Sequence, residues 1–168
     1  MPCSVLQARG YEAVEPTDVL TAPLPGRMPA PSGSAIRDLS LDEWVESHMT
    51  ISGRPPQSAP HLRGILEGCS QPRLLGALAP DEAAEPVACG LAVVDEDLVG
   101  LFDLMTAKPH RRRGYGAALA SSLLAWGHAQ GARHAYLQVV RTNLQARALY
   151  HKLGFTDVYS YWYRVRPT

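Results

Sequence analysis

The sequence predicts an α/β fold in which a mixed β-sheet carries helices on both faces. Three observations support this class: apolar runs of strand length alternate with segments of helical periodicity, glycines end the two clearest helices, and 46% of the 168 residues are apolar while 19% are charged. A chain of this length and composition can bury one good core. We therefore expect one compact domain at 35–168, preceded by a separate segment at 1–34.

The charge and the cysteine content of the sequence argue against nucleic acid, a membrane and a metal ion as partners. The formal net charge is +0 and the pI is near 7.0, so no global field attracts nucleic acid or an anionic membrane, and we expect neither as a partner. The three cysteines, Cys3, Cys69 and Cys89, lack metal-ligand spacing, and we expect no metal. Their odd number, without a signal-like N-terminus or a run of membrane-helix length, predicts a soluble cytoplasmic protein with reduced thiols.

The first 34 residues divide into a strand-like piece and a proline-rich linker. Asp18–Ala22 is β-prone, whereas Pro23–Ser34 contains four prolines and two glycines, which exclude a regular element. Arg9–Tyr11 is similar to Leu153–Phe155, and both are followed by strand-like residues. One hypothesis is that this first segment is the C-terminal end of a preceding domain half with a similar fold. The alternative is a strand at the edge of the same sheet.

The region 35–168 begins with a capping box. Ser40 and Glu43 have the spacing that caps a helix, and Leu41–His48 places Leu41, Trp44, Val45 and His48 on one apolar face. Gly131 and Gly154 are expected at the C-terminal ends of two later helices. The further elements expected are helices at 61–69, 114–130 and 143–153, and strands at 73–79, 87–94, 98–106, 134–140 and 159–166. The last strand carries one aromatic face, which we expect in the core.

The most informative stretch is Thr106–Ala117, where an apolar run is followed by a glycine-rich turn with three arginines. Gly114 and Gly116 allow backbone N–H groups to converge on phosphate oxygens, and Arg111–Arg113 add full charges. A dinucleotide fingerprint is excluded because Leu119 stands at its third glycine, and a P-loop is excluded because Gly-Lys-Ser/Thr is absent. The turn predicts a phosphorylated cofactor.

Two motifs resemble one known family. Arg111-x-x-Gly114-x-Gly116 resembles the acetyl-coenzyme A loop of the Gcn5-related N-acetyltransferases (GNAT). The second motif follows the first after a predicted helix and a predicted strand. It is the segment Asn143–Phe155, which matches the family's Asn-x-x-Ala-x-x-Leu-Tyr-x-x-x-Gly-Phe pattern. The resemblance covers roughly Val87–Arg166, and its one departure is Pro109, which stands one residue later than the family's proline.

The resemblance implies a GNAT fold, whose twisted mixed sheet splays between its fourth and fifth strands, and acetyl-CoA as co-substrate. The pantetheine arm would pair with the backbone of the fourth strand. A backbone amide of that strand near Met105 would stabilise the oxyanion. The residues thereby expected at the cofactor are Leu104, Met105, Thr106, Arg111, Arg112, Arg113, Gly114, Tyr115, Gly116, Ala117, Asn143 and Tyr150.

The implied activity is transfer of an acetyl group to a primary amine of a small molecule, an amino acid or a peptide N-terminus. Direct attack through a tetrahedral intermediate needs a proton donor for the thiolate, which the resemblance assigns to Tyr150, and a base for the amine. Gln138 stands where bacterial N-terminal acetylating relatives have a glutamate, so Asp103 is the candidate base, with a water chain as the alternative. Asn143 is expected to contact the cofactor arm, to act as an N-cap, or both.

A second class of function stays open from the sequence. A non-catalytic acyl-CoA-binding sensor or subunit would need the phosphate turn but not Tyr150. The resemblance also implies a possible assembly, a homodimer in which two copies of the chain pair through edge strands. The identity of the amine does not follow from any motif, although the variable region between Leu41 and Cys69 is expected to shape the acceptor site.

Overall fold

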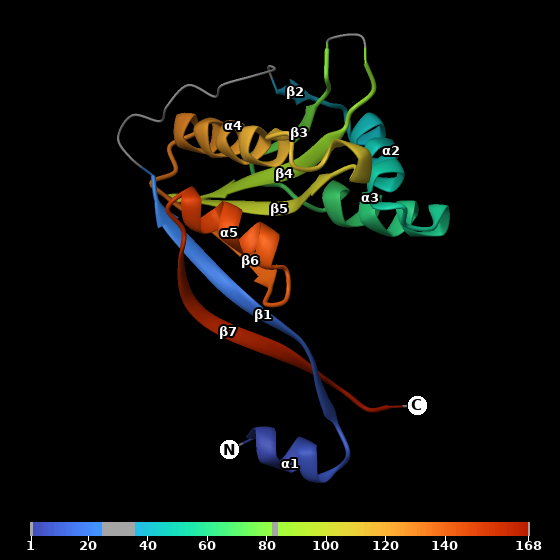
Figure 1. Cartoon of the computed structure of the whole chain (residues 1–168), viewed down its shortest axis with the longest axis vertical. Helices are drawn as coiled ribbons and strands as arrows, with labels where there is room; N and C mark the ends of the chain where they lie inside the picture. Colours follow the sequence, from blue (N-terminus) through green and yellow to red (C-terminus); the bar gives the residue numbers. More distant parts are fainter. Residues whose placement is uncertain (1, 25–35, 82–83, 168) are drawn as a thin grey trace. The chain divides into compact units, whose positions relative to one another are not determined.

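The computed structural model describes residues 2–24, 36–81 and 84–167, which fall into two compact units (Figure 1). Unit 1 comprises Met1–Ala22 and Tyr136–Thr168, and unit 2 comprises Pro23–Ala135. Most of the expected linker at Pro23–Ser34 lies outside the described residues. The expectation that 1–34 form a segment separate from the domain stays a prediction.

Unit 2 contains four antiparallel strands in the order β2 (Arg37–Asp38), β3 (Arg73–Leu78), β4 (Ala88–Asp95) and β5 (Leu98–Thr106). The last three confirm the strands expected from the sequence. β4 and β5 form a tight hairpin in which Asp95 pairs with Leu98 and Glu96 has a φ of 54°.

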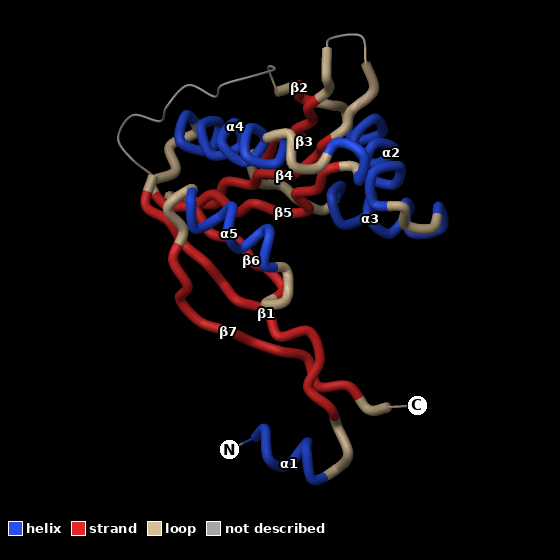
Figure 2. Tube along the Cα trace, viewed as in Figure 1, coloured by secondary structure: helices blue, strands red, loops and turns tan. Residues whose placement is uncertain are grey.

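Helices cover both faces of these strands. α2 (Leu41–Ser52) and α3 (Ala59–Glu67, after a 3₁₀ turn at Pro56–Ser58) cover one face, and α4 (Tyr115–Ala129) covers the other (Figure 2). Alternation along β4 explains this: Cys89 and Leu91 pack in the cluster of α2 and α3, whereas a Cβ on Gly90 would meet Leu119 and Leu123 of α4. The expected α/β class with helices on both faces is confirmed.

The expected helix signals are also confirmed. Ser40 and Glu43 form both bonds of the capping box that opens α2, and Gly131 follows α4 with a φ of 107°. α4 approaches the sheet closely at Gly127, where an added Cβ would lie 2.7 Å from a methyl group of Val99. None of the helices in the described ranges is long and apolar enough to cross a membrane.

Unit 1 contains the strand order β6 (His134–Val140, whose first two residues belong to unit 2), β1 (Glu12–Pro23) and β7 (Thr156–Val165). β1 lies between two strands rather than at an edge, and it runs antiparallel to β7 from the pair Glu12–Val165 to the pair Thr21–Thr156. Two short helices complete the unit: α1 (Pro2–Ala8), which the sequence did not predict, and α5 (Leu144–Lys152).

The prediction that the aromatic face of the final strand is core was wrong. Tyr159 and Tyr163 are 61% and 54% exposed, and Trp162 is 43% exposed. The physical reason is that β7 is the last strand in the order, and the described part of unit 1 has only two short helices with which to cover its strands. Alternation in the sequence therefore identified the strand but not its environment.

Candidate functional site

The turn between β5 and α4 is held by its own backbone and by one arginine. After β5 the chain makes a 3₁₀ turn at Lys108–His110, which accommodates the displaced Pro109. The Arg111 guanidinium then folds back, and its Nε donates to the carbonyl oxygen of Thr106 at 3.1 Å. Ala107 donates its N–H to Val87 at 2.8 Å, so the start of the turn is fixed to the sheet of unit 2. Arg111 thus braces the turn.

The end of the turn presents unpaired donors. Arg112 and Gly114 have left-handed φ angles of 64° and 89°, and Gly114 is the N-cap of α4, which therefore begins without a side-chain cap. The N–H groups of the first helical turn, at Tyr115, Gly116 and Ala117, therefore point out of the helix at the positive end of its dipole. Arg112 and Arg113 are both exposed beside them. This donor set fits a diphosphate in charge and in hydrogen-bonding capacity.

β5 carries a bulge immediately before the turn. Cys89 pairs with Met105 and Leu91 with Phe102, so two residues, Asp103 and Leu104, stand opposite the single residue between Cys89 and Leu91. Phe102 and Met105 both pack against the cluster formed by α2 and α3. In a regular strand, residues three apart face opposite sides, so the extra residue is what returns Met105 to the same face.

The bulge turns Asp103 toward α2. Asp103 has a φ of 49°, and its Oδ1 lies 3.6 Å from Nε2 of His48, whose side chain is fully buried. The Asp103 side chain remains 34% exposed. The pKa of Asp103 lies below its ordinary value because of the contact with His48, and the charge of Arg54 acts in the same direction against the effect of burial. An ionised, partly exposed carboxylate results.

Two further site candidates lie on α5 in unit 1. Asn143 is the N-cap of this helix, and its Oδ1 accepts a hydrogen bond from the N–H of Ala146 at 3.2 Å. Tyr150 is 7% exposed, and its ring packs edge-on against Phe155 with centroids 6.0 Å apart. Burial raises the pKa of Tyr150, so its phenol is protonated at neutral pH. The N-cap role of Asn143 is confirmed.

Gln138 stands at the position where the resemblance implied a glutamate base in some relatives, and in the structure its side chain makes a hydrogen bond within unit 1. Its Oε1 accepts a hydrogen bond from the hydroxyl of Tyr161 at 2.7 Å, which joins β6 to β7 within unit 1. The amide is thus engaged with a neighbouring tyrosine. Because a glutamine side chain has no titratable group, the proton acceptor stays a prediction, with Asp103 or a water chain in that role.

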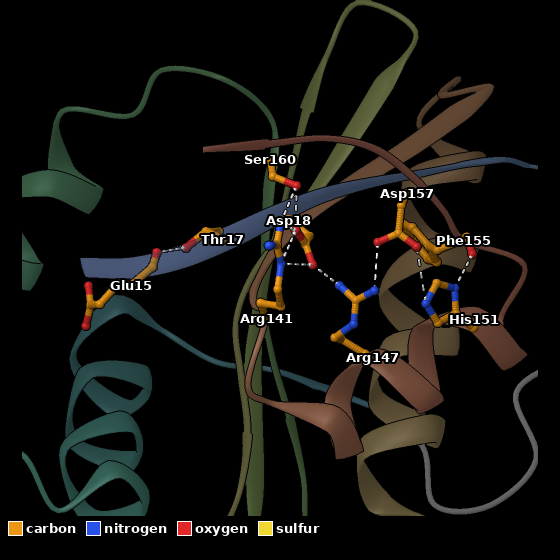
Figure 3. A network of polar contacts seen from close by, with 9 residues as sticks. All are labelled: Glu15, Thr17, Asp18, Arg141, Arg147, His151, Phe155, Asp157 and Ser160. Atoms are coloured by element: carbon orange, nitrogen blue, oxygen red, sulfur yellow. Dashed lines mark hydrogen bonds and ion pairs between the residues drawn. The ribbon is translucent and has the colours of Figure 1, made fainter. Parts of the chain in front are cut away.

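Unit 1 also contains a buried carboxylate that the sequence analysis missed (Figure 3). Asp18 in β1 accepts hydrogen bonds from Arg141 Nη2 at 2.8 Å and from Ser160 Oγ at 2.7 Å, and it pairs with Arg147. Arg147 in turn contacts Asp157 at 2.9 Å. The pKa of Asp18 is lowered chiefly by Arg141 and then by Ser160. An acidic residue within a β-prone run was the available signal.

The predicted site residues thus fall into two groups, one in each unit. Asp103, the end of β5, the arginines and the start of α4 lie together in unit 2, and Asn143 and Tyr150 lie one helix apart in unit 1. Their roles toward a cofactor stay predictions. The partnership of His48 with Asp103 was also missed, although a histidine on the apolar face of a helix and an acid within an apolar strand were visible in the sequence.

Comparisons with known proteins identify the family to which the chain belongs. The sequence model of the family described as "Probable histone acetyltransferase Rv0428c C-terminal" matches residues 5–164. A Bacillus subtilis protein described as the uncharacterized N-acetyltransferase YobR is 27% identical over 123 residues, which are 73% of this chain and 49% of YobR. The chain therefore spans about half the length of that relative.

Two solved structures show the same fold. A GCN5-related N-acetyltransferase from Sphaerobacter thermophilus matches with a TM-score of 0.77 at 21% identity, over 99% of this chain and 56% of the other. One from Kribbella flavida matches with a TM-score of 0.64 at 21% identity, over 99% of this chain and 63% of the other. The expected fold is confirmed, while the splay between β5 and β6 stays a prediction. The chain belongs to the Rv0428c C-terminal family, within the GNAT superfamily.

Proposed function

We propose that this chain transfers an acetyl group from acetyl-CoA to a primary amine. The observation that carries the proposal is the turn before α4, where an uncapped helix N-terminus, a left-handed Gly114 and the exposed Arg112 and Arg113 stand together. Free N–H groups and guanidinium groups are the donors that a diphosphate needs. The family membership supports an acetyltransferase, and the donor, the acceptor and the roles below are our proposal.

Each half of the reaction has a candidate group in this chain. Acetyl-CoA, when bound, supplies the thioester whose carbonyl carbon the amine attacks. Asp103 accepts the proton that the amine loses, directly or through water; the carboxylate is ionised, and its lowered pKa makes it a weaker base than an ordinary carboxylate. The protonated Tyr150 hydroxyl donates a proton to the departing sulfur. A C–N bond forms, a C–S bond breaks, and solvent returns the proton from Asp103 to Tyr150.

The first test separates binding from transfer. We would titrate the purified chain with acetyl-CoA by calorimetry and then add amines while recording the release of free thiol. The panel would hold amino acids, amino sugars, polyamines and lysine peptides, the last because the family's description names a histone acetyltransferase. We expect saturable binding and thiol release with at least one amine. An absence of binding would overturn the proposal, and binding without release would favour an acyl-CoA sensor.

Two substitutions locate the cofactor site. The double variant Arg112→Gln/Arg113→Gln should raise the dissociation constant of acetyl-CoA about tenfold or more, because charge-assisted contacts are lost. The control Arg166→Gln removes a comparable exposed guanidinium outside the turn and should leave the constant unchanged. Equal effects of the two variants would show only a general dependence on positive charge.

Tyr150→Phe tests the proton donor separately. The variant keeps the buried ring and its contact with Phe155 but removes the hydroxyl. We expect kcat to fall by roughly 10²-fold, a typical contribution of general acid catalysis, with the affinity for acetyl-CoA preserved. An unchanged kcat would remove Tyr150 from the mechanism without affecting the assignment of the phosphate turn.

A further inference from the structure

Helix α2 contacts both strands of the β5 bulge, through two side chains one helical turn apart. Trp44 donates its indole N–H to the carbonyl oxygen of Gly90 at 3.1 Å, and Gly90 is the residue of β4 that stands opposite the bulge. His48 directs Nε2 toward the carboxylate of Asp103 on the bulge itself. The two rings pack with centroids 5.1 Å apart. The helix thus holds the strand pair at the point where β5 is irregular.

We propose that His48 is the positioning residue for Asp103: its ring, fixed by Trp44, holds the carboxylate in the orientation that meets the acceptor amine. This inference rests on the proposed function, since it assigns His48 a part in the reaction of the same site. His48 is fully buried and cannot touch an acceptor, whereas Asp103 is one-third exposed. A direct effect of His48 on the reaction would therefore pass through Asp103, in contrast to an effect on the packing of α2.

The backbone at Asp103 shows why such a partner is needed. A left-handed φ is unfavourable in a residue other than glycine, and the surroundings must hold it in place. Nε2 of His48 is the ring nitrogen that faces the carboxylate, at 3.6 Å from Oδ1 of Asp103, which is longer than an ordinary hydrogen bond. Neither ring nitrogen of His48, Nδ1 or Nε2, has a hydrogen-bond partner among the residues that the structure describes. The approach of Nε2 to Asp103 is therefore the polar contact through which the ring can act on the carboxylate.

The other charged and titratable groups near Asp103 have limited influence. Arg54, which follows α2, lowers the pKa of Asp103 by its charge. This effect of Arg54 on the pKa is smaller than that of the contact with His48. Cys89 in β4 is buried, and burial together with the charge of Asp103 raises the pKa of this thiol to about 12. Cys89 therefore stays a neutral thiol across the working pH range. His48 is the main partner that the structure gives to the carboxylate.

The decisive experiment compares His48→Phe, which removes the N–H, with His48→Gln, whose amide can replace it. The control Val45→Ala loosens the same buried face of α2 without touching Asp103. The first readout is the titration of the Asp103 carboxyl carbon by NMR in the unliganded protein. We expect the pKa of Asp103 to rise in His48→Phe and to stay near the wild-type value in His48→Gln and Val45→Ala. An unchanged titration in His48→Phe would overturn the proposal.

The second readout is kinetic. His48→Phe should lower kcat by about 10- to 100-fold and move the acidic limb of the kcat/KM profile to higher pH, with KM for acetyl-CoA unchanged. In an Asp103→Asn background the same change should have no further effect on kcat, whereas additive losses would show a merely structural role. If the wild type acetylates no amine, the proposed function fails, and the NMR titration alone still decides whether His48 controls Asp103.

Discussion

Two carboxylates, Asp18 in unit 1 and Asp103 in unit 2, are both held ionised by cationic or N–H partners, but they differ in how completely they are paired. Asp18 is 4% exposed and contacts two arginines and a serine. Asp103 has one facing ring nitrogen at 3.6 Å and a side chain that is 34% exposed. A saturated carboxylate has no free lone pair for a ligand, so Asp18 stabilises the fold. The incompletely paired Asp103 is the one available for chemistry.

The contrast predicts that Asp103→Asn separates activity from stability. Because the amide cannot accept the proton of the amine, we expect kcat/KM to fall by about 10²- to 10³-fold. The free energy of unfolding should change by less than about 1 kcal/mol, since asparagine tolerates the left-handed conformation as well as aspartate does. Steady-state kinetics and urea denaturation measure the two quantities. A large loss of stability with little loss of rate would reverse the assignment.

Asp18→Asn should show the opposite behaviour. The amide removes one of the two anionic partners of the partly buried Arg147, which keeps Asp157, so the free energy of unfolding should fall by roughly 2–3 kcal/mol. We take a modest value because Arg141 is half exposed and water screens its charge. Under conditions in which the variant is folded, kcat with the preferred amine should stay within about twofold of the wild type. Urea denaturation with parallel kinetics tests this, and a selective loss of kcat in the folded variant would contradict a purely structural Asp18.

The two carboxylates also show what the sequence could and could not predict. Periodicity and capping residues predicted the helices and most strands, because each depends on neighbours in the chain. The motifs at Arg111 and Asn143 indicated the family for the same reason, and the sequence also predicted the turn before α4, whose phosphate-binding role stays a prediction. The contacts of Asp18 with Arg141 and Ser160 span 123 and 142 positions, and His48 meets Asp103 from another element. Such pairings depend on the strand register and on the bulge, which local pattern does not specify.

The stability that Asp18 contributes should depend on pH in a defined direction. The folded pKa of Asp18 lies below the ordinary value of about 3.9. The contribution is therefore complete above that value and is lost as the pH falls through the folded pKa, where the native carboxylate takes up a proton. The difference in unfolding free energy between wild type and Asp18→Asn should shrink below about pH 4. Denaturation at several pH values between 3 and 7 would show it, and a constant difference would mean that charge is not the cause.

The smallest expected effect concerns the neutral partner of Asp18. Ser160→Ala removes one hydroxyl donor at 2.7 Å but leaves Arg141 and Arg147 in place. We expect a loss of about 1 kcal/mol, the usual net value of one hydrogen bond. The exposed loop residue Ser70 offers the matched control Ser70→Ala, which should have little effect. Because two cations still neutralise the carboxylate, the loss must be smaller than that of Asp18→Asn. If Ser160→Ala instead equals Asp18→Asn, the hydroxyl rather than the arginines is what keeps Asp18 ionised, and the contrast with Asp103 rests on a hydrogen bond rather than on charge.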